Sequence, residues 1–123
     1  MSVEIEITNH SNHCKVTLVG KCTIYNTIKL KDTLLSVIQS NENILIDLAK
    51  VNDFDTAGMQ LFISAKNTAK KYNKKIKFVS HPDCVLAIMD LYGLVGFFGD
   101  KIVLSQDGRK KFPFKYGTKK RNA

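Results

Sequence analysis

The stretch VNDFDTAGMQLF (51–62) places a carboxylate, a hydroxyl and a glycine within four positions, at Asp55, Thr56 and Gly58. Asp and Thr are favoured helix N-cap residues, because their side-chain oxygens accept hydrogen bonds from the free amides of the first turn. A hydroxyl there can also carry a phosphate, with a charge of about −1.5 to −2. Gly58 would let a partner or an anion approach the backbone closely. These residues allow two interpretations, a plain cap or a modification site, and the cap is the simpler one.

Other candidate sites are weaker. His10, His13 and Cys14, in HSNHC, are metal-ligand types, but no fourth ligand stands at a usual spacing. His81 precedes Pro82, which is typical of the start of a helix. The sequence contains neither a GxxxxGK[ST] phosphate loop nor a GxSxG nucleophile elbow. We therefore predict no metal, no cofactor and no enzymatic activity.

The hydrophobic pattern predicts the elements around these residues. A β-hairpin is predicted at the start of the chain. Apolar and polar residues alternate over 3–7, a polar turn follows at 9–12, and a second strand-like run spans 14–19. The short apolar run 44–48 predicts a central strand buried on both faces. We expect another strand at 75–79 and a short last one at 101–104.

Three segments have helical periodicity. The first begins near Asn26 or Thr27, either of which could cap it, and the third runs from Pro82 to about Tyr92, with Gly93 as its stop. The predicted core positions of the three helices are Leu30, Leu34, Val37 and Ile38, then Met59, Phe62, Ala65, Ala69 and Tyr72, then Val85, Leu86 and Met89. The order β-β-α-β-α-β-α-(β) predicts an α/β fold, with one sheet of four to five mixed strands and three to four helices.

The net charge of +8 is unevenly distributed over the 123 residues. Residues 105–123 carry +6, whereas the rest of the chain carries only +2. We therefore divide the chain into one domain, 1–104, and a basic C-terminal tail, 105–123. Such a tail can contact nucleic acid or anionic lipid by counterion release, but a solvated, partly disordered end is the simpler interpretation.

The cellular compartment is predicted from the cysteines and from the apolar runs. Cys14, Cys22 and Cys84 are odd in number and lack CxxC spacing, so we expect free thiols. No apolar run approaches the roughly 20 residues that cross a bilayer, and the first residues have no secretory pattern. A cytoplasmic location is expected.

Four stretches together resemble the sulphate-transporter and anti-sigma-factor-antagonist (STAS) domain family. DTAGM is similar to the family's Asp-Ser/Thr-Ser/Ala-Gly-Leu/Met signature after a hydrophobic strand. The family's second strand and first helix resemble LVGKCTIYNTIKLKDTLL. Its central strand with the signature resembles ILIDLAKVNDFDTAGMQLF, and its last helix resembles HPDCVLAIMDLYGLVGFF. The resemblance spans about residues 3–104.

The resemblance implies a function and a site. In anti-sigma-factor antagonists the hydroxyl after the signature Asp is phosphorylated by a partner kinase, often the anti-sigma factor, and only the unmodified form binds. This residue corresponds to Thr56 here, a threonine in place of the commoner serine. The implied partner-binding surface is Asn52, Asp53, Asp55, Thr56, Gly58 and Met59, in a loop and the first turns of the next helix.

Two alternatives remain open within the same family. TIYN and DTAG resemble STAS proteins associated with chemotaxis kinases, and also the STAS subunit of phospholipid-transport ABC assemblies. In those proteins the threonine would serve the contact surface without being phosphorylated. The predicted partner is thus a kinase-like anti-sigma factor, a chemotaxis kinase or an ABC ATPase.

Overall fold

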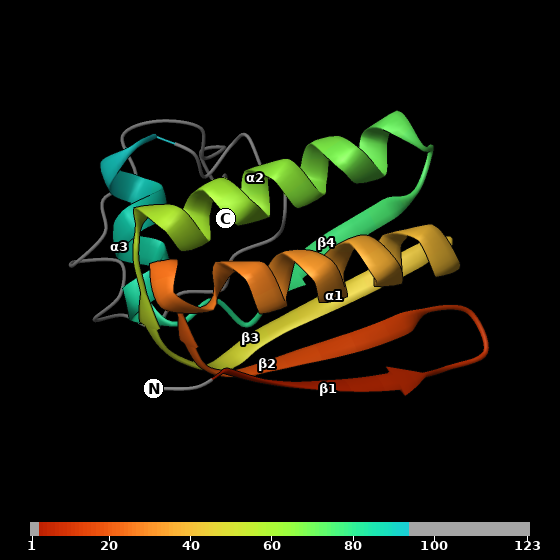
Figure 1. Cartoon of the computed structure of the whole chain (residues 1–123), viewed down its shortest axis with the longest axis horizontal. Coiled ribbons are helices and arrows are strands. Elements are labelled where there is room, and N and C mark those ends of the chain that lie inside the picture. The colour runs from red at the N-terminus through yellow and green to blue at the C-terminus, as the bar shows by residue number, and fades with distance from the viewer. Residues whose placement is uncertain (1–2, 94–123) are drawn as a thin grey trace, which may run out of the picture.

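Strands and helices alternate along residues 3–93, the part of the chain that the computed structural model describes (Figure 1). The elements are β1 (Val3–Asn9), β2 (Cys14–Cys22), the 3₁₀ turn η1 (Ile24–Asn26), α1 (Thr27–Ser40), β3 (Asn43–Phe54), α2 (Thr56–Lys71), β4 (Lys75–Val79) and α3 (Asp83–Leu91). The predicted fold class and element order are confirmed for this part of the chain. The strand expected at 101–104 and the tail 105–123 lie outside the described residues.

The four strands form one mixed sheet in the order β1-β2-β3-β4. β1 and β2 are the predicted antiparallel hairpin, and β2, β3 and β4 run parallel. Both parallel connections advance in the same direction across the sheet, and such crossovers are right-handed. α1 and α2 therefore cover the same face side by side, and α3 lies at the end of the sheet where β3 stops (Figure 1).

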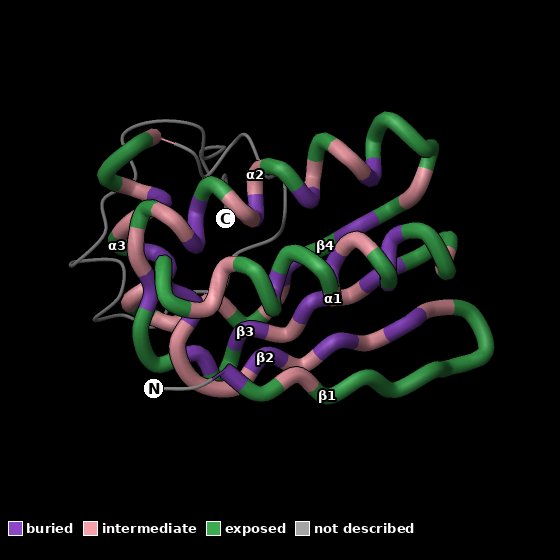
Figure 2. Tube along the Cα trace, in the orientation of Figure 1, coloured by how far each residue is buried: buried purple, intermediate pink, exposed green. Residues whose placement is uncertain are grey.

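The core lies between this sheet face and the helices (Figure 2). Val16, Ile46 and Phe78 stand in register on neighbouring strands and are all buried. The opposite face of β3 is less covered, since Leu45 and Asp47 have intermediate exposure and Asp47 pairs with Lys15 at 3.6 Å. The prediction that this strand is buried on both faces was wrong.

β3 is much longer than predicted. It continues through Asn52 and Asp53 to Phe54, where a polar turn was expected. The extra residues pair with the end of β2, with Lys21 opposite Asp53 and Cys22 opposite Phe54, after two irregularities in the register. Phe54 is buried and its ring lies 5.1 Å from that of Phe62. Pairing and this aromatic contact outweigh the local turn preference of Asn and Asp.

The helix ends differ from the expectations in three places. Asn26 occupies the N-cap position of α1, but its side chain donates to the Lys21 carbonyl at 2.8 Å instead of capping. Tyr72 follows α2 as its C-cap and is 54% exposed, so its predicted place in the core was wrong. Pro82 precedes α3 as its N-cap residue. Gly93, with φ 64°, ends that helix as predicted.

Candidate functional site

The carboxylate of Asp55 is bonded at both of its oxygens. Oδ1 accepts from the Gly58 amide at 3.0 Å, which caps α2. Oδ2 accepts from the Ile24 amide, also at 3.0 Å, in the segment between β2 and α1. Asp55 is therefore the predicted N-cap, and it also connects two parts of the chain that are 31 positions apart.

Thr56 is the first residue of α2 and is exposed. Its hydroxyl makes no hydrogen bond with any residue in the range 3–93. The first turn of α2 contains no acidic residue, and the Asp55 carboxylate that caps the helix faces the positive end of its dipole. A phosphate at this exposed position would stand at a helix end that favours anions.

Gly58 has a different role from the one predicted. It is buried, and a Cβ at this position would overlap the carbonyl oxygen of Cys22 and approach Cε1 of Phe54 to 2.9 Å. The close approach is therefore made by the chain's own backbone, not by a partner or an anion. Gly58 permits α2 to begin directly against the end of β2.

The other predicted contact residues divide into two groups. Asn52 and Asp53 are exposed at the end of β3, and Asp53 lies 3.9 Å from the Lys21 ammonium group. Met59 is only 1% exposed and belongs to the core. The prediction that Met59 contacts a partner directly was wrong, because its side chain faces the sheet. Met59 and Gly58 instead support the exposed surface from beneath.

Beside Thr56 lies an exposed apolar segment that the sequence interpretation missed. Ile24, Tyr25 and Ile28 are 62%, 77% and 78% exposed. We call residues 24–28 the apolar segment. Its signal in the sequence was Ile28, which stands two positions before the core residue Leu30 and hence on the other side of the helix. Large side chains this exposed and this close together are typical of a protein-binding surface.

Two cysteines lie behind this surface. Cys22 is fully buried, and burial, reinforced by Cys84 and the Asp55 carboxylate, raises the pKa of its thiol to about 12. Burial also raises the pKa of Cys84, against backbone hydrogen bonds that lower it. All three cysteines are free thiols, as predicted. The raised pKa values make them poor nucleophiles at neutral pH.

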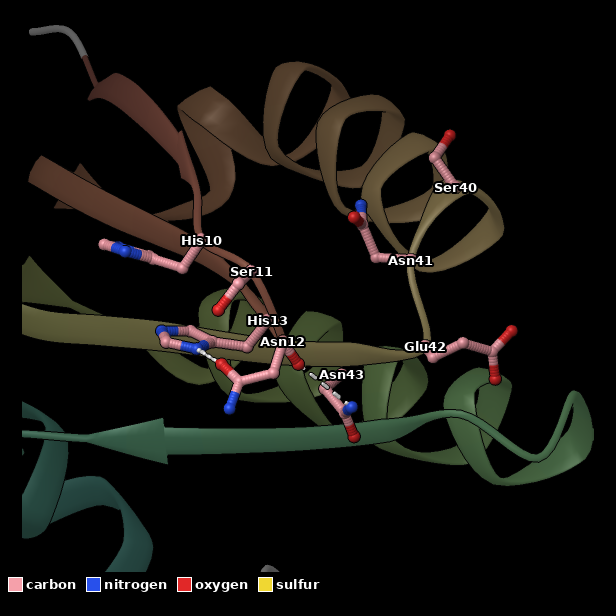
Figure 3. Close-up of a pocket in the computed structure, with 8 residues that line it drawn as sticks. All are labelled: His10, Ser11, Asn12, His13, Ser40, Asn41, Glu42 and Asn43. Carbon is pink, nitrogen blue, oxygen red and sulfur yellow. Dashed lines mark hydrogen bonds between the residues drawn. The ribbon is translucent and has the colours of Figure 1, made fainter.

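A shallow polar pocket of about 370 Å³ lies at the opposite end of the sheet (Figure 3). It is formed by the β1–β2 turn and by residues 40–43, from the end of α1 to the start of β3. His10 and His13 stack there with ring centroids 4.6 Å apart, and Nδ1 of His13 is bonded to the Asn12 amide oxygen at 2.9 Å. Within residues 3–93 no group of three or more metal-ligand side chains converges. His10, His13 and Cys14 therefore gain no support as a metal site.

No helix among the described residues has the length and apolar character needed to span a bilayer.

One curated relative is an anti-sigma-B factor antagonist from Bacillus subtilis. It is 20% identical over 94 residues, which cover 76% of this chain and 86% of the relative. The alignment thus spans most of both proteins.

Solved structures share the fold. An anti-sigma factor antagonist from Mycobacterium paratuberculosis superposes with a TM-score of 0.74 at 18% identity, covering 91% of this chain and 95% of that one. RsbS from Moorella thermoacetica, solved as a serine-to-glutamate variant, has a TM-score of 0.65 at 17% identity, covering 89% and 94%. Unphosphorylated SpoIIAA has a TM-score of 0.66 at 10% identity, covering 88% and 95%.

The family model described as "Mlab, STAS domain" matches residues 5–104. This match covers most of the chain, including the Asp55–Thr56 junction and the apolar segment. The protein is therefore a member of the STAS domain family.

Proposed function

We propose that this chain is a regulatory, non-enzymatic STAS module of the anti-sigma factor antagonist type, acting in the cytoplasm by binding a protein. The observation that carries the proposal is that Thr56 is exposed, makes no side-chain hydrogen bond within residues 3–93, and lies beside the exposed apolar segment. The relatives support it, since one is named an anti-sigma-B factor antagonist and SpoIIAA has been solved in unphosphorylated and phosphorylated forms.

The proposed contact surface combines polar and apolar parts. The polar part lies at the end of β3 and the start of α2 and consists of Asn52, Asp53, Asp55 and Thr56. The apolar segment provides the large side chains that a partner can bury, and its Tyr25 is of a residue type that often carries much of the binding energy of an interface. Gly58 and Met59 contribute by holding α2 against the sheet.

The proposed switch is phosphorylation of Thr56 by the partner kinase. A bond forms between Thr56 Oγ1 and the γ-phosphorus of a nucleoside triphosphate, and the bond to the leaving diphosphate breaks. The hydroxyl proton passes to a base of the kinase. The phosphate would stand beside the carboxylates of Asp53 and Asp55. Repulsion and the cost of desolvating it in a packed interface would release the partner.

Affinity capture from the cytosol of the source organism tests this proposal. The baits are the full chain, Thr56→Glu, which adds a charge, and Thr56→Gln, which adds similar bulk without charge. We expect a kinase of the anti-sigma factor class on the wild type, reduced on Thr56→Glu more than on Thr56→Gln. That kinase should phosphorylate Thr56 when given ATP. Equal recovery on all three baits would mean that Thr56 is a helix residue without a regulatory role.

A second candidate keeps the surface and changes the partner. The matching family model carries the Mlab description, not the name of an antagonist, and position 56 is threonine instead of serine. These observations favour an accessory subunit packed on the ATPase of a phospholipid-transport ABC assembly. Capture of that ATPase would favour this second candidate, provided that Thr56→Ser still binds it and variants with a bulky residue at position 56 do not. Capture of a chemotaxis kinase would place the chain with the third kind of partner.

A further inference from the structure

We infer that Asp55 is a positioning residue that holds the apolar segment in place relative to Thr56. Its biological meaning rests on the proposed function, in which both regions contact one partner. The geometry is a single carboxylate whose two oxygens accept from Gly58 in α2 and from Ile24 at the start of the segment, each at 3.0 Å.

Among the described residues, few other hydrogen bonds fix the apolar segment to the rest of the protein, and one of them is the backbone bond from the Asn26 amide to the Thr23 carbonyl. The segment is a single 3₁₀ turn followed by the first residues of α1, and no side chain caps either start. Ile24, Tyr25 and Ile28 are mostly exposed, so their side chains provide weak anchoring. The bond of Asn26 to the Lys21 carbonyl ties the segment to β2, and that of Thr27 to the Ile24 carbonyl is internal. Asp55 supplies the polar link to the start of α2.

This link makes the position of the apolar segment sensitive to charge at Thr56. Phosphate oxygens on Thr56 and Oδ1 of Asp55 compete for the same first-turn amides of α2, and the two anions repel each other. Displacing Asp55 from the cap also weakens its hold on the Ile24 amide. Phosphorylation would then act on side chains that the phosphate does not itself touch.

The test replaces Asp55 by Asn in the full chain and measures amide hydrogen exchange by NMR. Asn is also a good N-cap, so its oxygen keeps the Gly58 bond. The amide group in place of Oδ2 cannot accept from Ile24. Because hydrogen bonds to charged groups are among the stronger ones, exchange at the Ile24 amide should accelerate by about tenfold or more. Exchange in the centres of α2 and β3 should stay unchanged.

Two further variants make the result decisive. Asp53→Asn removes an equal charge two positions away, at a carboxylate that does not contact Ile24, and should leave the Ile24 amide as in wild type. Asp55→Ser keeps a capping oxygen but cannot serve both amides, so it should reproduce Asp55→Asn. Unchanged Ile24 exchange in both Asp55 variants, or equal acceleration at all amides, would overturn the inference. The experiment needs no partner, so its failure is separate from a failure of the capture experiment.

Discussion

Gly58 lies directly against the carbonyl oxygen of Cys22, so that the first turn of α2 rests on the last residue of β2. This contact joins the start of α2, which carries Thr56, to the end of β2, which the apolar segment follows. The space beside the Cα atom of Gly58 is too small for a methyl group. A Cβ at position 58 would meet backbone on one side and the ring of Phe54 on the other.

Gly58→Ala should therefore destabilise the protein, although alanine is the better helix former by about 1 kcal/mol. Overpacking of this kind costs about 1–3 kcal/mol, and here part of the obstacle is backbone that cannot rotate away. Urea denaturation should show a lower free energy of unfolding. Gln60→Ala, at an exposed position of the same helix, should be neutral to slightly stabilising. An increase in stability for Gly58→Ala would contradict the packing argument.

The buried thiol of Cys22 should make stability depend on alkaline pH. Its pKa rises from 9.0 to about 12 on folding. Between these values the unfolded chain has lost the proton and the folded chain still holds it. The free energy of unfolding should therefore fall as pH rises above 9, by at most about 1.4 kcal/mol per pH unit from this group.

Urea denaturation at several pH values from 8 to 10.5 checks this slope. Cys22→Ala is the matched chain, since it differs from wild type by this one thiol. It should be less stable at pH 8, because a buried side chain is shortened. Its stability should fall less steeply with pH. Parallel curves for the two proteins would show that Cys22 does not cause the slope.

The sequence predicted the elements wherever one face of an element determines its pattern. The stripe Leu30, Leu34, Val37 and Ile38 located α1, and all four residues are buried. The sequence failed where pairing with a distant segment decides the outcome. Asn52 and Asp53 have turn preferences, but pairing with β2 extends β3 through them. Likewise, nothing local to Asp55 shows that its second oxygen binds the Ile24 amide.

The candidate site was predicted only in part, because some of its contacts are made with segments distant in the sequence. Asp55 as a cap follows from neighbouring residues, and the structure confirms it. The roles of Gly58 and Met59 depend on what packs against the first turn of α2, and that information lies in β2 and the sheet. Exposure of the apolar segment depends on where the axis of α1 lies, which only the assembled fold determines.

Thr56→Glu should separate binding from folding. A carboxylate at the first position of α2 interacts favourably with the helix dipole, by about 0.3–1 kcal/mol, which offsets its repulsion from Asp55, so the fold should remain intact. Partner affinity should fall, because the charge enters a contact surface that already contains Asp53 and Asp55. Titration calorimetry with the captured partner measures the affinity, and urea denaturation the stability. Thr56→Gln is the control for bulk, and equal affinities for Glu and Gln would refute a charge-based switch.

Tyr25→Ala tests whether the apolar segment is the anchor of the interface. Tyr25 is 77% exposed, so truncating it should change the free energy of unfolding by no more than about 0.5 kcal/mol. Aromatic anchors at interfaces typically contribute about 2 kcal/mol or more, which corresponds to a loss of affinity of roughly 30-fold. Tyr72→Ala is the matched control, since Tyr72 is 54% exposed at the far end of α2 from Thr56. Both variants should fold as wild type does, and only Tyr25→Ala should weaken partner binding in calorimetry. If both bind like wild type, the partner contacts the Asp55–Thr56 junction without covering residues 24–28.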